Sequence, residues 1–333
     1  MRIHFTTADL ARTGLANGPD SMWELVNSLQ MLQSRYGRAV FDPWRRRTVE
    51  TLRQADLTGR VRARLFPIAP HAAYFPDLLT PSEGALGVNE GIEAILRTPR
   101  HRLDAELGLL TRTPGAASWV DDLATGRVAA LTELGQVLRT FHETAVQPYW
   151  SRLSHWVDND LAIRRQAIRK GGVDLLLASF RPMMRWNPPV LEVPGHPSDR
   201  DIHLDGRGIQ LIPSYFCWLH PLTIFDPGLP QVVVYPVDHD LRWLEPGIAG
   251  VSNRRLARLL GHTRAEVLLA ARDGCTTGDL ARRLGVSAAV ISHHTGILRD
   301  SGLITSRRMA NNVLHARSPL GSALCVAHLD NIS

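Results

Sequence analysis

The side chains best suited to bind a polyanion gather in the last quarter of the sequence. Residues 252–333 hold 11 basic and 5 acidic side chains, a net charge of +6, whereas residues 1–251 hold 27 of each sign. Arg307 and Arg308 are adjacent in this segment, and His293 and His294 precede them. Arginine binds phosphate oxygens, and histidine also forms hydrogen bonds with base edges. The residue types therefore fit binding to nucleic acid.

The spacing of capping residues around these side chains predicts two consecutive helices. Thr276 and Asp279 have the spacing of a capping box and predict a helix that ends at Gly285. Ser287 then caps a second helix over residues 288–300. Two helices joined by a tight turn that contains glycine form a helix-turn-helix, which places its second helix in the major groove of DNA.

Further elements on both sides predict a winged unit. Thr263 and Glu266 also have capping-box spacing and predict a helix that starts there. Residues 303–308 and 313–317 alternate apolar and polar side chains around a turn, which predicts a hairpin, or wing. A last helix is expected after Pro319.

The predicted second helix has an inner and an outer face. We expect Val290, Ile291, Ile297 and Leu298 to be buried and the side chains near the start of the helix to face outward. The candidate DNA-binding residues lie on the helix-turn-helix or the wing: Thr277, Ser287, Ala288, Ala289, Ser292, His293, His294, Arg299, Arg307, Arg308, Asn311 and Asn312.

The N-terminal part predicts a larger, mainly helical domain. Leucines at helical spacing predict core-facing helices over residues 21–33 and 126–145, the latter with Val128 facing inward, and a helix from Pro148 that ends at Gly171 and Gly172. Arg45, Arg46 and Arg47 are expected on a solvated helix face.

Two short apolar runs, Ile209–Ile212 and Val232–Tyr235, predict strands of a small antiparallel sheet. The fold class is therefore mainly α with minor β (α+β). A composition change near Glu245 to Gly250 divides the chain into residues 1–250 and residues 251–333.

The C-terminal segment resembles the ArsR-type winged-helix transcriptional regulators. The run from Asp279 to Ser287, the run from Val290 to His294 and the run from Leu298 to Ile304 carry the resemblance. It implies a homodimer formed by the first and last helices of the winged domain, bound to a pseudo-palindromic operator.

The N-terminal segment resembles an uncharacterised domain found fused ahead of such winged helices. The matching stretches are Pro148–Trp150, Asp160–Ala162, Gly206–Ile209, Ile212–Ser214 with Phe216 and Trp218, and Val234–Pro236. This resemblance implies no particular activity.

Several classes of site are disfavoured. Thr276 and Gly278 occupy the positions of the cysteine pair of the arsenic-sensing branch, and Asn331 follows His328 where the zinc-sensing branch has a metal-binding pair. The cluster of His196, Asp199, Asp201, His203 and Asp205 lies in a segment rich in Pro and Gly and is interpreted as a polar loop. We therefore expect no metal and no cofactor.

Enzymes and membrane proteins are also disfavoured. The sequence contains no nucleophile elbow, dinucleotide-binding loop or phosphate-binding lysine loop. Three widely spaced cysteines favour a reducing compartment, and no apolar run is long enough to span a membrane, so we expect a cytoplasmic protein.

The leading hypothesis is a dimeric transcriptional regulator, expected to be a repressor, whose N-terminal domain senses a small apolar molecule, sets the dimer geometry, or both. The alternative keeps DNA binding and makes the N-terminal domain a structural or partner-binding module without a ligand. An enzyme with a DNA-binding appendage ranks last.

Overall fold

The computed structural model describes residues 1–72, 74–110, 117–196, 198–237, 256–271, 275–309, 312–318, 320–322 and 324–325. The chain divides into two compact units, Met1–Tyr36 with Trp44–His239 and Gly37–Pro43 with Asp240–Ser333. Each unit has its own cluster of buried apolar side chains. The predicted boundary near residue 250 lies outside the described residues.

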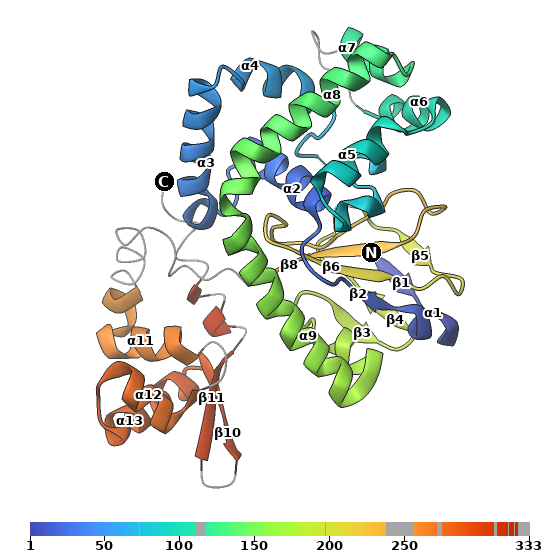
Figure 1. The fold of residues 1–333 in the computed structure, drawn as a ribbon. Helices are drawn as coiled ribbons and strands as arrows, with labels where there is room; N and C mark the ends of the chain where they lie inside the picture. Colours follow the sequence, from blue (N-terminus) through green and yellow to red (C-terminus); the bar gives the residue numbers. More distant parts are fainter. Residues whose placement is uncertain are drawn as a thin grey trace. The chain divides into compact units, whose positions relative to one another are not determined.

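Helices predominate in the described residues before residue 240, and this part of the chain also contains two small sheets (Figure 1). The α-helices are α1 (Thr7–Arg12), α2 (Ser21–Gln33), α3 (Arg38–Gln54), α4 (Thr58–Arg60), α5 (Val88–Leu96), α6 (Arg100–Gly108), α7 (Ala117–Ala124), α8 (Val128–Phe141) and α9 (Trp150–Ala178). Short 3₁₀ or π segments are η1 (Val61–Leu65), η2 (Asp77–Leu79), η3 (Ser82–Ala85), η4 (His142–Val146) and η5 (Gln147–Tyr149). The predicted α+β class is confirmed.

The strands form two four-stranded mixed sheets. The first has the order β3 (Arg185–Asn187), β4 (Val190–Glu192), β1 (Arg2–His4), β5 (Asp201–His203), and the second β2 (Gly14–Leu15), β6 (Gln210–Ser214), β8 (Val232–Pro236), β7 (Leu222–Thr223). The predicted strands β6 and β8 are present, but the prediction of an antiparallel sheet is wrong because they pair in parallel. The chain between them forms β7, which pairs antiparallel with the far edge of β8.

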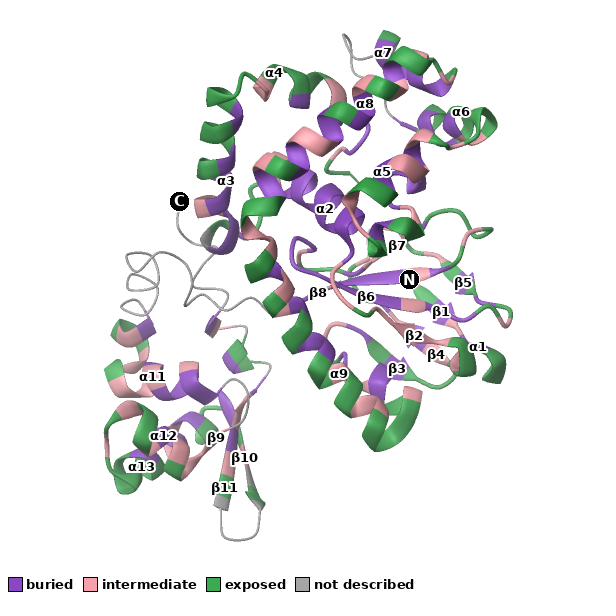
Figure 2. Ribbon diagram, viewed as in Figure 1, coloured by how far each residue is buried: buried purple, intermediate pink, exposed green. Residues whose placement is uncertain are grey.

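Helix α2 runs through the interior and is buried on every side from Ser21 to Met31 (Figure 2). Asp20 caps its N-terminus by accepting hydrogen bonds from the amides of Met22 (3.0 Å) and Trp23 (3.1 Å). The carboxylate of Glu24 accepts from the amides of Tyr215 (2.6 Å) and Phe216 (3.0 Å), just beyond β6. The buried polar residues of α2 thus hold the end of a strand, a role that leucine spacing alone does not predict.

Helix α9 changes direction where two glycines interrupt it. The helix was predicted to end at Gly171 and Gly172; its backbone is non-helical there, with φ +65° at Gly172, but the helix resumes and ends at Ala178. Arg164 joins the two halves, because it pairs with Asp160 (3.1 Å) and donates to the carbonyl of Ser179 (2.7 Å). The start of α9 also differs from the prediction, because η5 precedes it and the α-helix begins at Trp150.

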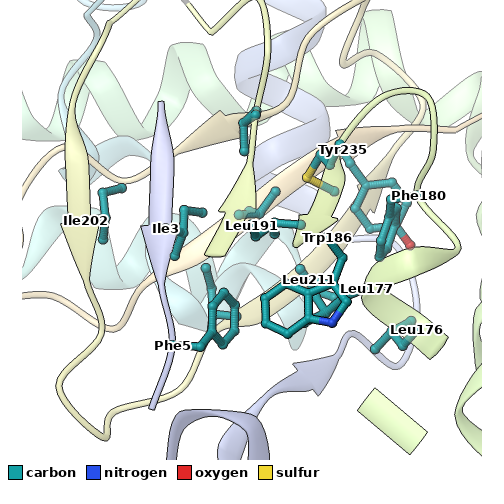
Figure 3. Close-up of a cluster of buried hydrophobic side chains, with 14 of the residues drawn as sticks. Ile3, Phe5, Leu176, Leu177, Phe180, Trp186, Leu191, Ile202, Leu211 and Tyr235 are labelled. Carbon is teal, nitrogen blue, oxygen red and sulfur yellow. The ribbon is translucent and has the colours of Figure 1, made fainter. Parts of the chain in front are cut away.

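A cluster of buried side chains connects the two sheets with the second half of α9 (Figure 3). Ile3 of β1 is fully buried and lies in register with Leu191 and Ile202 on the neighbouring strands. Phe5 and Trp186 meet edge to face with ring centroids 5.2 Å apart, a favoured arrangement for aromatic pairs. These contacts fix the N-terminal strand against segments that follow it by about 190 residues.

Two side chains of this unit do not lie where the sequence analysis expected them. Val128 is 77% exposed because it is the first residue of α8, whose buried stripe begins two residues further along, at Ala130. Arg45 is buried, not solvated, since its guanidinium donates to the carbonyls of Met31 (2.7 Å) and Tyr36 (2.5 Å). It thereby satisfies carbonyl groups at and beyond the end of α2.

The described residues of the second unit form several short helices, including helical stretches at Leu259 and Leu320, and a three-stranded sheet. Its elements are α11 (His262–Ala270), β9 (Cys275–Thr276), α12 (Thr277–Leu284), α13 (Ala288–Asp300), β10 (Ile304–Met309) and β11 (Asn312–Arg317) (Figure 1). Val267 and Leu268 of α11, Leu280 of α12 and Ile291 of α13 are fully buried at its centre. The expected capping box of α11 is wrong, because the N-cap is Gly261, two residues before Thr263, and Glu266 pairs with His262 instead (3.3 Å).

Candidate nucleic-acid interface

The turn before α13 is built from local signals in the sequence. Thr276 and Asp279 form the predicted capping box at the start of α12, with hydrogen bonds of 3.1 Å in both directions. Gly285 ends α12 in the left-handed conformation (φ +66°), which glycine adopts without steric cost. Ser287 then caps α13 by accepting from the amide of Val290 (3.3 Å). The predicted helix-turn-helix geometry is therefore present.

Helix α13 has a buried stripe and an exposed first half. Ile291, Thr295 and Leu298 face the interior at helical spacing, with at most 3% exposure. The expectation that Val290 is buried is wrong, because it lies one residue before this stripe, turned about 100° away, and is 39% exposed. The candidate DNA-binding residues exposed in this region are Ser287, Ala288, Ala289, Ser292 and His293.

The two adjacent histidines of α13 have different environments. His293 is exposed, whereas His294 is half-buried, and their ring centroids are 5.4 Å apart. Burial lowers the pKa of His294, and the nearby His293 and Arg264 lower it further. His294 is therefore mostly neutral at neutral pH, and His293 has the better access to a base edge or a phosphate.

The predicted wing is present as an antiparallel pair, β10 with β11. Arg308 is exposed on β10 and lies opposite Val313 of β11. Arg299, at the end of α13, is 55% exposed and pairs with Asp300 (2.9 Å). Among the predicted contacts, Asn311 and the side chains of Arg307 and Asn312 lie outside the described residues.

One predicted contact, Thr277, is engaged within the unit. Its hydroxyl lies 2.9 Å from Nε2 of His315, and Nδ1 of the same ring lies 2.8 Å from the hydroxyl of Ser306. Neither Ser306 nor His315 was predicted from the sequence as a functional residue. The predicted hairpin contained a partial signal, because residues opposite each other on antiparallel strands share a face.

Neither unit shows a metal centre in its described residues. No group of three or more His, Cys, Asp or Glu side chains there has an arrangement that could hold a metal ion. Cys275 donates to the carbonyl of Ala270 (3.2 Å). The expected polar loop is wrong at Asp201 and His203, which lie on β5, and Asp201 pairs with Arg2 (2.8 Å) and His4 (2.8 Å) of β1. No helix within the described ranges is long and apolar enough to cross a membrane.

Sequence comparisons divide the chain in a similar way. Residues 86–240 match a family of unknown function (DUF5937), and residues 255–307 match a helix-turn-helix domain family. The chain is similar to the HTH-type transcriptional regulator YgaV of Escherichia coli (strain K12), with 34% identity over 65 residues. This match covers 20% of the chain and 66% of the regulator, slightly less than two thirds. The prediction of a C-terminal helix-turn-helix domain is confirmed.

Proposed function

We propose that this protein is an ArsR-type transcriptional regulator that binds duplex DNA through its C-terminal unit. One observation carries the proposal: the first half of α13 is capped by Ser287 and exposes its outer face, while Ile291 and Leu298 fix the helix on α11 and α12. This is the geometry that places a recognition helix in the major groove. The similarity to an HTH-type transcriptional regulator supports it.

In this proposal, the recognition helix contacts base edges and the wing contacts the sugar-phosphate backbone. His293 and Ser292 contact base edges, and the methyl groups of Ala288 and Ala289 can contact thymine. Arg308 neutralises a phosphate beside the groove, together with Arg299 and Arg307, and Asn311 and Asn312 contact the sugar-phosphate backbone from the wing. The excess positive charge of residues 252–333 favours this binding mode.

We also propose that the protein acts as a homodimer, and as a repressor, on a pseudo-palindromic operator. Leu259 and Leu320 are 59% and 58% exposed, and both belong to short helical stretches at the two ends of the C-terminal unit. Large exposed apolar side chains on two such elements favour burial against a second copy. A two-fold dimer would place its two recognition helices about 34 Å apart, one turn of DNA.

The effector of this regulator is proposed to be a small, mainly apolar molecule that carries an N–H or O–H group. Asn27 Oδ1, Thr48 Oγ1 and His142 Nε2 are buried atoms without a hydrogen-bond partner among the described residues. Their elements are adjacent, since α2 packs on η4 and Trp44 of α3 donates to the carbonyl of Ala145 (2.8 Å). Buried polar atoms are normally satisfied by a partner, water or ligand.

Such a ligand regulates only if it binds the DNA-competent and incompetent states with different affinity. Burial lowers the pKa of His142 to about 4, so this side chain would meet the ligand as a neutral imidazole. Regulation of this kind predicts that the ligand changes both the tryptophan fluorescence of the N-terminal unit and the affinity for DNA, because seven of the eight tryptophans belong to that unit.

The salt dependence of DNA affinity tests the DNA-binding proposal. The Kd of the full chain for a promoter fragment from its own gene is measured between low and moderate salt, for the wild type, Arg308→Ala and Arg62→Ala. Each phosphate contact contributes about 0.9 to the slope of log Kd against log salt, so Arg308→Ala should lower the slope by about one. Arg62 is exposed in the other unit and its variant should behave as wild type. A Kd that does not change with salt would contradict the proposal.

A further inference from the structure

We propose that His315 is a positioning residue that locks the wing to helix α12, with Thr277 and Ser306 as its two hydrogen-bond partners. The inference rests on the proposed DNA-binding function and extends it, because it assigns the orientation of the wing to a buried side chain that never touches DNA. It also gives Thr277 a role inside the protein in place of the direct DNA contact expected from its sequence position.

The geometry joins three elements at one imidazole ring. His315 lies on β11 and is 4% exposed. Its Nε2 lies 2.9 Å from the hydroxyl of Thr277, the first residue of α12, and its Nδ1 lies 2.8 Å from the hydroxyl of Ser306 on β10. The backbone of His315 is in register with Ser306 on one side and with Cys275 of β9 on the other. Both ring nitrogens are therefore satisfied within the unit.

The protonation state of the ring fits this arrangement. Burial lowers the pKa of His315, and the positive charge of Arg299 lowers it further. A neutral imidazole has one N–H donor and one acceptor nitrogen, and a hydroxyl can play either part. One ring nitrogen thus donates to a hydroxyl and the other accepts from a hydroxyl, so the ring needs no water or charged partner.

The position of the ring along the hairpin explains how it can orient the wing. Ile304, Ser306 and Arg308 alternate along β10 and so share one face of the hairpin. Ile304 is 2% exposed and belongs to the core, whereas Arg308 is exposed. The ring of His315, opposite Ser306, lies between them. The hydrogen bond between His315 and Ser306 is therefore the last contact that fixes this face of the hairpin before Arg308.

Thr277, the residue of α12 to which His315 bonds, is also held in a fixed position. Thr277 follows Thr276, whose capping box with Asp279 fixes the first turn of α12. Helix α12 packs on α13. A bond from His315 to Thr277 therefore sets the position of Arg308 relative to the exposed face of the recognition helix. Besides this bond, the two residue pairs between β9 and β11 connect the wing to this end of α12.

Two pairs of variants test the hydrogen bond between the His315 ring and Thr277. Thr277→Val removes the hydroxyl at nearly constant volume, and Thr277→Ser retains it. His315→Gln places an amide near the position of Nε2, and His315→Asn places one near Nδ1. Thr277→Val and His315→Asn therefore break the link to α12, whereas Thr277→Ser and His315→Gln can keep it.

Each variant of the full chain is examined by amide hydrogen exchange of residues 304–317 without DNA, by thermal unfolding, and by the salt slope of Kd. We expect Thr277→Val and His315→Asn to speed exchange in the wing several-fold and to lower the salt slope by about one, the contribution of one phosphate contact. Thr277→Ser and His315→Gln should retain the wild-type slope, and His315→Gln serves as the rescue by a conservative substitution.

Two results would overturn the positioning role. If all four variants have the wild-type salt slope of Kd and the wild-type hydrogen exchange in the wing, the bond between His315 and Thr277 does not orient the wing. A lower melting temperature with an unchanged salt slope would show a merely structural role. If a His315 variant does not fold, the Thr277 pair still decides between these results. Absence of DNA binding by the wild type would contradict the proposed function instead, and the exchange measurement would then test the lock alone.

Discussion

The proposed dimer can be tested through Leu320, whose exposed side chain we expect to be buried against a second copy. Leu259 and Leu320 are 59% and 58% exposed, so a little more than one leucine side chain per protomer remains to be buried. Burial of a whole leucine contributes about 1.5–3 kcal/mol, and a symmetric dimer buries both protomers' shares, roughly 4–7 kcal/mol in total. Each factor of ten in Kd corresponds to about 1.4 kcal/mol.

Leu320→Arg removes about half of this contribution and places two like charges near the two-fold axis. The dimer Kd should rise by at least roughly 30-fold, because about 2 kcal/mol or more is lost. Sedimentation velocity over a range of protein concentrations measures this change. Leu86→Arg introduces the same charge at a leucine that is 77% exposed in the other unit and should leave the Kd unchanged. A Leu320→Arg protein that remains as dimeric as the wild type would refute the interface.

Three further predictions concern base reading, helix capping and pH. His293→Ala should alter the base preference selected from a randomised operator library; an identical preference would exclude His293 as a reading residue. Ser287→Ala should destabilise the C-terminal unit by about 1 kcal/mol through loss of the α13 cap, as measured by the hydrogen exchange of its core amides; unchanged exchange would speak against the cap. Burial raises the pKa of Glu24 from 4.5 to about 7, so the folded state keeps a proton that the unfolded chain releases, and stability should fall by up to about 3 kcal/mol as pH rises from 4.5 to 7. Urea unfolding followed by tryptophan fluorescence should show this slope reduced in Glu24→Gln, and an equal slope in both proteins would exclude Glu24 as its source.

Local signals in the sequence were sufficient for most of the C-terminal unit. A capping box such as Thr276 with Asp279 depends on residues three apart, and Gly285 satisfies a backbone conformation at its own position. The hairpin of the wing was predicted from alternation within each strand, and β10 and β11 form it. The face of α13 was harder to predict, because Val290 and Ile291 are both apolar and only the packing of α11 and α12 decides which is buried.

The N-terminal unit depends on contacts that a local pattern does not contain. Glu24 is buried because Tyr215 and Phe216, some 190 residues later, supply its hydrogen bonds. The parallel pairing of β6 and β8 results from the path of β7 around the sheet edge. Arg45 was expected in solvent, since nothing near it in sequence shows that it reaches the carbonyl of Met31. Thr277 shows the same limit in the candidate site, because its partner His315 follows 38 residues later.

Footprinting of the purified full chain on the DNA upstream of its own and adjacent genes tests the central claim most directly. We expect two protected half-sites of related inverted sequence, with centres about 10 base pairs apart, because two recognition helices of a two-fold dimer enter successive major grooves. Protection that is no stronger on these fragments than on unrelated DNA would contradict it.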